Sequence, residues 1–494
     1  MENIIKSNYF NNNKNIEIPV NARILSKYDN LKQILTYTAD SNSINTDISD
    51  GILEVNGKIN IRILAWDTEE GVVSLNYNTD FQDTMPIEWI NEKSNLIYDT
   101  IIKEINAKLI SENEVEFTAI AAINITEIQN EEIQIDKVPD NLILRNDTIN
   151  IGSISSRLNK TIKVNYETDM QKNIMKILQA DSEVMLKSAV LEDEILKISG
   201  NIYMQLICLN DEKLPSVLIL PVPFDEEIEA DKFTSCSLPF VRLNSTSTKV
   251  HIDTSEENGI KLNATISIDV NAMCIENKEY DCVCDAYSIN HNIELNYNNI
   301  SNMHYNGNTN ASINFSGIVE SADSISKVLG VYNCKNKLLN TECDNGNASI
   351  NGIVSGTLLY YDINENIKNE LFDLPYSETI KIPDCDVNNT LIIDTCITNI
   401  SALKNNTGAE LNGTFSIIAY IIANDNQKIM TSVVIGEEKI ENNNAIEAVM
   451  ANPGDDLWTI GKSLNMSPDT LLEINPELNE PLTKPTKIVI YRSL

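Results

Sequence analysis

The sequence predicts a mainly β protein, with three tandem antiparallel β-sandwich-like repeat domains and a small C-terminal βααβ domain. Three observations support this prediction. Apolar and polar residues alternate with a period of two along much of the chain, as in half-buried strands. One strand–turn–strand pattern occurs three times. Residues 446–494 carry two successive helix-start signals between short strand patterns.

The three copies align on a glycine within a β-patterned run. A turn residue follows it after ten residues, and an aromatic residue follows after 24 (81−57, 224−200 and 376−352). An Ile-Leu or Val-Leu pair precedes each glycine. The glycines are Gly57, Gly200 and Gly352; the turn residues are Asp67, Asn210 and Asp362; the aromatics are Phe81, Phe224 and Tyr376; the pairs are Ile34-Leu35, Ile177-Leu178 and Val328-Leu329.

This spacing predicts whole domains rather than solenoid turns, because the glycines lie 143 and 152 residues apart (200−57 and 352−200). We expect each glycine to mark a bulge or a close backbone approach, and each aromatic to pack in a core. Short strands separated by turn clusters favour antiparallel sandwiches or barrels. The expected units are a polar N-terminal arm (1–16), three repeats (17–160, 161–300 and 301–436), a linker (437–445) and a C-terminal domain (446–494).

The order of Ile/Val-Leu pair, strand, turn, strand and aromatic resembles the SPOCS domain of spore coat proteins from endospore-forming bacteria. The resemblance covers roughly residues 17–436. It implies a structural role for the repeats.

Charge and cysteine content restrict the class of partner and the compartment. The chain has 72 acidic and 37 basic side chains and a net charge of −35. That field repels phosphate backbones and anionic lipid, so nucleic acid is an unexpected partner. With no apolar run of about eighteen residues, we expect no membrane insertion. No secretory signal pattern stands at the N-terminus, so the nine cysteines are expected to be reduced cytosolic thiols.

The C-terminal segment begins with a turn at Pro453-Gly454, after which Asp455 or Asp456 can cap a helix. One face of that helix carries Leu457, Ile460, Gly461 and Leu464. Ser467 and Pro468 signal a second helix, which Asn475-Pro476 should end. The flanking strands are expected over 447–450 and 487–491.

This segment resembles the LysM domain, in its run from Pro453 to Ile460, its middle leucines and its Ile474-Asn475-Pro476 sequence. LysM domains bind N-acetylglucosamine polymers in a groove between two loops. Carried onto this chain, the groove residues are Gly454, Asp455, Asp456, Leu457, Asn475, Pro476, Glu477 and Leu478. Two positions depart from the family pattern: Val449 replaces a common aromatic, and Asp456 replaces a small hydroxyl residue.

SPOCS repeats combined with a C-terminal LysM domain resemble the coat morphogenetic proteins of clostridial spores. The resemblance implies a non-catalytic scaffold in the mother-cell cytoplasm, at the forespore surface. Its LysM domain would dock on the ATPase of the forespore coat, or on peptidoglycan or a chitin-like glycan. The alternatives are a cell-wall protein that binds N-acetylglucosamine polymers and a phage-tail-like structural protein with a LysM domain.

We expect neither catalysis nor a cofactor or metal. Gly461-Lys462-Ser463 lacks the glycine that a phosphate-binding loop needs at position 456. Cys282 and Cys284 are separated by one residue rather than the two to four of zinc sites, and no second pair follows. The three histidines are isolated in sequence.

Overall fold

The computed structural model describes residues 4–49, 51–91, 94–170, 174–231, 233, 238–255, 259–383, 385–387, 389–439, 446–478 and 482–491. The protein is mainly β, built of antiparallel sheets, with two short helices near the C-terminus, which confirms the predicted fold class at that level. Within these residues, no helix is both long and apolar enough to cross a membrane.

One six-strand arrangement occurs three times along the chain. The first strand pairs with the sixth and the sixth with the fifth, while the second, third and fourth form another sheet. The first copy has β1 (Ile4–Leu25), β2 (Leu31–Ser49), β3 (Ile52–Asp67), β4 (Gly71–Pro86), β5 (Asn95–Ser111) and β6 (Glu114–Gln134). The second has β7 (Ile143–Met170), β8 (Ile174–Glu192), β9 (Ile195–Asn210), β10 (Pro215–Glu229), β11 (Pro239–Ser255) and β12 (Gly259–Tyr287). The third has β13 (His291–Glu320), β14 (Ile325–Asp344), β15 (Asn347–Asp362), β16 (Ile367–Lys381), β17 (Asn389–Lys404) and β18 (Gly408–Glu438).

The two sheets of a copy bury their apolar faces in a common core. In the first copy, Ile59 and Ile61 of β3 belong to the same buried cluster as Val115 and Phe117 of β6. Alternate residues along each strand supply these side chains, as the period of two in the sequence predicts.

The repeated spacing in the sequence corresponds to a hairpin. Each motif glycine lies directly across from its aromatic, as Gly57 from Phe81 in β3 and β4. A Cβ on Gly200 would lie 2.2 Å from the Met185 carbonyl oxygen and 2.8 Å from the Phe224 ring, so the backbone approach there is close. The expected bulge lies in the neighbouring strand rather than at the glycine itself, since the register shifts between Leu186 and Ser188.

The repeated turn residue holds the hairpin closed. The Asp67 carboxylate accepts hydrogen bonds from the backbone N–H groups of Glu69 and Glu70, both at 2.9 Å. Asn210 and Asp362 accept equivalent bonds in the other copies. Such Asx turns satisfy the backbone donors of a tight reversal.

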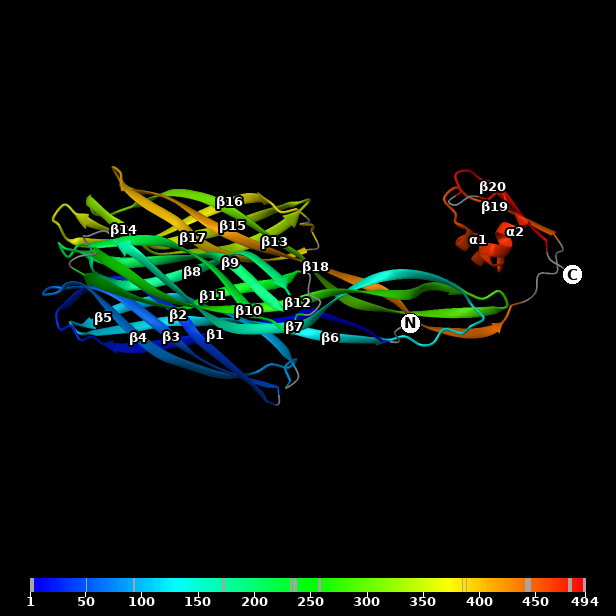
Figure 1. Ribbon diagram of the computed structural model, residues 1–494, viewed down its shortest axis with the longest axis horizontal. Helices are drawn as coiled ribbons and strands as arrows, with labels where there is room; N and C mark the ends of the chain where they lie inside the picture. The colour runs from blue at the N-terminus through cyan, green and yellow to red at the C-terminus, as the bar shows by residue number, and fades with distance from the viewer. Residues whose placement is uncertain are drawn as a thin grey trace.

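The Ile/Val-Leu pair marks a bulge in the second strand of each copy. The strand register shifts across Leu35, Leu178 and Leu329, so these leucines leave the regular alternation. Leu35 and Leu178 are buried in one apolar cluster, against which Leu329 packs. This cluster draws residues from all three copies, so the copies meet at one shared cluster in the wide part of the molecule, which we call the head (Figure 1).

Charged side chains from all three copies also meet at this centre. Arg62 of β3 pairs with Asp40 of β2 and, at 2.7 Å, with Asp181 of β8. Lys335 of β14 pairs with Asp40 at 2.9 Å. Burial raises the pKa of Asp40, but the charges of Lys335 and Arg62 outweigh this and hold it below its usual value. Burial and the neighbouring Asp40 charge raise the pKa of Asp181.

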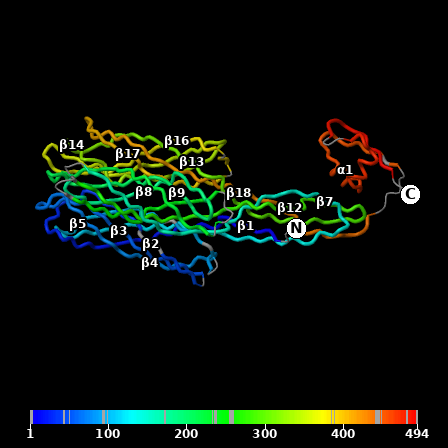
Figure 2. The backbone as a smooth tube through the Cα atoms, viewed as in Figure 1, coloured from blue at the N-terminus to red at the C-terminus, as the bar shows by residue number. Residues whose placement is uncertain are grey.

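Beyond the head, the first and last strands of each copy continue as a two-stranded ribbon, and the three ribbons form a stalk (Figures 1 and 2). A second apolar cluster fills the stalk with residues from all three ribbons. These residues are Ile5, Ile133, Ile151, Tyr280, Cys282, Ile300 and Ile429.

Some expected domain limits lie inside these long strands. The limit at 160/161 is within β7, and the limit at 300/301 is within β13. Most of the expected polar arm, from Ile4 onward, belongs to β1 and pairs with β6. The sequence pattern changes little where a strand passes from stalk to head, so alternation alone does not locate a limit there. Of the expected linker, 440–445 lies outside the described residues.

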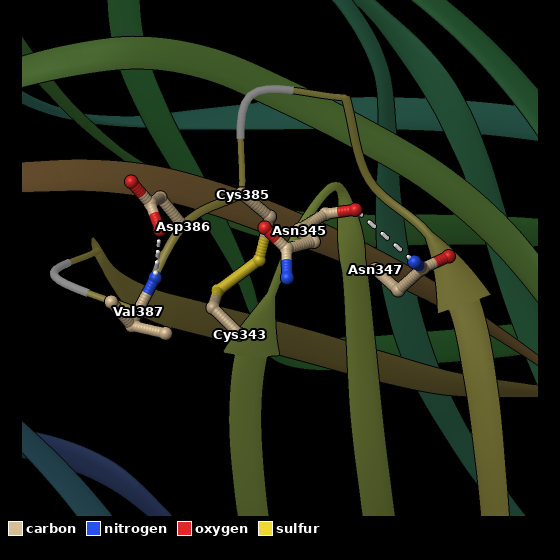
Figure 3. Close-up of a disulfide and its surroundings, with 6 residues drawn as sticks. All are labelled: Cys343, Asn345, Asn347, Cys385, Asp386 and Val387. Carbon is tan, nitrogen blue, oxygen red and sulfur yellow. Dashed lines mark hydrogen bonds between the residues drawn. A yellow bond between two sulfur atoms is a disulfide. The ribbon is translucent and has the colours of Figure 1, made fainter.

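The expectation that all nine cysteines are free thiols is wrong. Cys343, at the end of β14, and Cys385, before β17, form a disulfide across a sequence separation of 42 residues (Figure 3). Closing a loop of that length stabilises the fold by about 4 kcal/mol in the chain-entropy model. Free cysteines among the described residues are Cys208, Cys274, Cys282, Cys284, Cys334 and Cys396; Cys236 lies outside them.

Alkylation should detect this disulfide. In purified protein that has been exposed to air and then denatured without reductant, Cys343 and Cys385 should escape modification, while the six free cysteines react. After reduction, both should gain the label, as read by peptide mass spectrometry. Labelling of both positions before reduction would contradict the pairing.

Replacing Leu35 with alanine should test how much the apolar cluster shared by the three copies stabilises the head. This fully buried side chain is 0% exposed, so the Leu35→Ala cavity should lower the free energy of unfolding by about 3 kcal/mol in denaturant titrations. Leu25→Ala is the matched control, because Leu25 is 77% exposed and should change stability by no more than about 0.5 kcal/mol. If Leu35→Ala and Leu25→Ala lowered the free energy of unfolding equally, the shared cluster would not be what stabilises the head.

Candidate functional site: the C-terminal module and its seat on the stalk

Residues 446–491 form a separate small module. Strands β19 (Ile446–Ala451) and β20 (Thr486–Tyr491) pair antiparallel, and helices α1 (Leu457–Leu464) and α2 (Pro468–Ile474) lie between them in the chain. The module has its own core, in which Leu471, Ile488 and Ile490 are fully buried.

Both helices begin where the sequence predicts. The Asp456 carboxylate accepts from Thr459 N at 2.8 Å and caps α1. The Ser467 hydroxyl accepts from Thr470 N at 3.1 Å and caps α2, with Pro468 in its first turn. At the other end of α1, Asn465 adopts a left-handed conformation and stops the helix.

The first predicted groove loop is tied to the chain before β20. Gly454 N donates to Leu482 O at 2.7 Å, and Leu482 N donates to Asp455 O at 3.2 Å. The Asp455 side chain accepts from Asn452 N at 2.8 Å. Leu457 is buried in the module core, so it packs rather than lining a surface. Gly454 is exposed.

The second predicted loop, like the first, contains both buried and exposed residues. Asn475 is buried; its amide donates to Val489 O at 2.9 Å and accepts from Val489 N at 3.0 Å, joining the end of α2 to β20. Leu478 is buried in the core, whereas Pro476 and Glu477 are exposed. Three of the eight predicted residues, Leu457, Asn475 and Leu478, therefore have structural positions.

The outward side of α1 rests on the tip of the stalk. Trp458 Nε1 donates to Asp285 Oδ2 at 2.8 Å, and Lys462 Nζ donates to Asp285 Oδ1 at 2.6 Å. The Trp458 and Tyr287 rings meet edge to face, with centroids 4.9 Å apart. Asp285 and Tyr287 are in the last residues of β12, so the stalk ends beneath the helix.

Further contacts surround this pair of rings. Arg145 of β7 pairs with Asp456 at 3.1 Å, through the carboxylate that also caps α1. The Tyr287 hydroxyl donates to Met466 O at 2.8 Å. Lys439, just past β18, donates to Ser288 O at 2.7 Å and to the Asn465 side chain. We call these stalk residues (Arg145, Asp285, Tyr287, Ser288 and Lys439) the seat.

Sequence reasoning did not identify the seat. Arg145 and Asp285 stand far from Trp458 in the chain and belong to no recognisable motif. Either Asp455 or Asp456 alone suffices to cap a helix, so the other carboxylate could meet a basic group. In the structure, Asp456 performs both tasks, and the basic group belongs to the same chain.

The two aspartates at this contact, Asp285 and Asp456, have lowered pKa values. Burial raises the pKa of Asp285, but hydrogen bonds from Lys462 and Trp458 outweigh this and lower it. The Thr459 hydrogen bonds lower the pKa of Asp456, with a smaller contribution from the Arg145 charge. Burial raises the pKa of Tyr287 to about 12, so its hydroxyl remains a donor at neutral pH.

One shallow hollow lies elsewhere, on the third repeat. It has a volume of about 350 Å³ and is lined from β13, β17 and β18, mostly by amide and hydroxyl side chains. Its lining includes no carboxylate, histidine or cysteine. Across the described part of the chain, no group of three or more His, Cys, Asp or Glu is arranged to hold a metal ion.

Comparison of the chain with protein-family models, curated proteins and solved structures gave no match.

The lowered carboxyl pKa values predict how pH affects the seat. A depressed pKa means that the stabilising charge is fully present above the ordinary Asp value of about 3.9, and is lost as pH falls through the lower folded value. Fluorescence assigned to Trp458, by difference from Trp458→Phe, should therefore stay constant from about pH 8 to 5 and change only below about pH 4. Circular dichroism of the sheets separates this change from global unfolding, and a midpoint near pH 6–7 would contradict the carboxylate assignment.

Proposed function

We propose that this protein is a non-catalytic scaffold of spore coat assembly, in which a LysM-like C-terminal module docks on a protein of the forespore coat, the coat ATPase. The observation that carries the proposal is the separation of two parts: a three-copy head and a small module at the far end of a stalk (Figure 1). A scaffold that connects two layers needs two surfaces held apart.

The length of the stalk supports this role. The part of β12 beyond the core of the head, from Glu276 to Tyr287, spans about 40 Å at about 3.3 Å per residue. Three ribbons around an apolar cluster make a stiffer spacer than a flexible linker would. A stiff spacer gives head and module a defined separation.

Charge favours a protein over a glycan as the main partner. Residues 446–494 carry seven acidic and four basic side chains. Bacterial cell walls are largely anionic, so this field opposes attachment to them and favours a basic protein surface. The exposed remainder of the second groove loop ends in acidic Glu477.

The proposed location is the mother-cell cytoplasm, at the forespore surface. The cytosol keeps most thiols reduced, so the Cys343–Cys385 disulfide is not expected to form while the protein is in the mother-cell cytoplasm. On this proposal, the disulfide forms when the finished coat meets an oxidising medium. Protein taken from young mother cells should then be reduced at both positions, and protein from released spores oxidised.

The second candidate is a phage-tail-like structural protein. The elongated stalk favours it, because three ribbons around one apolar cluster make a rigid spacer. Fluorescence microscopy of the tagged protein separates the two: a ring around the forespore supports the coat scaffold, whereas co-sedimentation with tail-like particles supports the alternative.

Reversing the charge of Glu477 should weaken docking on the coat ATPase. In the full chain, Glu477→Lys should slow association several-fold at low salt, with less effect at high salt, as expected for an exposed charge at an interface. Asp469→Lys makes the same charge change at an exposed position at the start of α2 and serves as the control. Binding kinetics on immobilised ATPase and on purified peptidoglycan give the comparison. Tight wild-type binding to peptidoglycan with none to the ATPase would overturn the proposed partner.

A further inference from the structure

The outward side of α1 is already occupied by the protein itself. Trp458, Lys462 and Asp456 each contact the seat through a hydrogen bond, an ion pair or a ring contact. The seat residues come from the ends of β7 and β12 and from the chain after β18, so they belong to the second and third ribbons. These three side chains of the module are therefore turned toward the stalk.

This contact is mostly polar and only partly shielded from water. The Arg145 side chain is 51% exposed and Lys462 43% exposed, each against a less exposed aspartate. Ion pairs with that much exposure stabilise little, because solvent and salt screen them and ordering long side chains costs entropy. Tyr287 and Ser288 are the buried groups of the seat. The exposed ion pairs therefore contribute little to holding the module against the stalk.

The module does not depend on the seat for its core. Its buried cluster comes from its own strands and helices and includes Leu471, Ile488 and Ile490. The buried cluster next to the stalk tip is likewise built from stalk residues, including Val283, Ala286 and Met430. Separation would leave both cores intact.

We propose that the seat is an intramolecular competitor for the α1 side of the module, and that the protein partner docks there by displacing it. The partner would present the chemistry of the seat: a carboxylate for Lys462 and the Trp458 indole, and a basic group for Asp456. The identity of the partner rests on the proposed function, whereas the closed state does not.

Competition has a consequence that direct contact does not. When only the open fraction can bind, the apparent dissociation constant rises as that fraction falls. A substitution in a stalk residue of the seat that weakens its contact with the module should tighten partner binding. Substituting Trp458, Lys462 or Asp456 in the module should weaken partner binding, because those side chains contact both the seat and the partner.

The test uses the full chain with Asp285→Asn, which removes the charge that faces Lys462 and Trp458 while keeping the shape of the side chain. Asp281→Asn is the matched control: it lies four residues earlier on β12, is exposed, and bonds to Thr148 rather than to the module. Acrylamide quenching of Trp458, by difference from Trp458→Phe, reports opening without any partner.

We expect Asp285→Asn to raise Trp458 quenching several-fold and to tighten binding to the coat ATPase by a similar factor, while Asp281→Asn changes neither. If quenching is unchanged even in Asp285→Asn combined with Arg145→Glu, the closed state is wrong. If quenching rises but ATPase binding weakens, the seat is not a competitor. If quenching rises in Asp285→Asn but neither the wild type nor the variant binds the ATPase, the closed state is supported and the ATPase is not the partner.

Discussion

A two-stranded β ribbon is barely stable by itself in water, and the stalk consists of three of them. Each ribbon contributes apolar residues such as Ile5, Ile151 and Ile300 to one shared cluster, so none has a core without the other two. In the head, by contrast, the first and third copies each have a core of their own, but the bulged Leu35 and Leu178 are buried in a cluster where the copies meet. Three copies in one chain satisfy this requirement at any protein concentration, since they cannot dissociate from one another.

Covalent linkage also lets the copies differ where they meet. Near a threefold axis of identical subunits, a charged group would face two copies of itself. Here the second strands of the three copies present Asp40, Asp181 and Lys335, and Arg62 joins the two aspartates. Burying these charges costs desolvation energy, so the cluster adds little net stability. Its members come from all three copies, so their ion pairs favour this arrangement of the copies.

Much of the head could be predicted from the sequence, and the stalk and seat could not. The spacing from Gly57 to Phe81 is a local property of one hairpin, and the caps at Asp456 and Ser467 involve neighbours within a few residues. By contrast, alternation is the same whether a strand lies in the head or in the stalk. The pairing of Cys343 with Cys385 depends on two distant chain ends meeting, which cysteine counting does not encode.

The short helix α1 contacts both the module core and the stalk. Leu457, Ile460 and Leu464 point into the module core, whereas Gly461 lies against the seat. A Cβ at Gly461 would lie 2.7 Å from Met466 O and 2.8 Å from the Tyr287 hydroxyl oxygen, so the missing side chain admits both the module's own turn and the stalk. A substitution there would disturb folding and docking together. Trp458 and Lys462 contact the stalk and do not belong to the buried core of the module, so the contact with the stalk can change without loss of the module's fold.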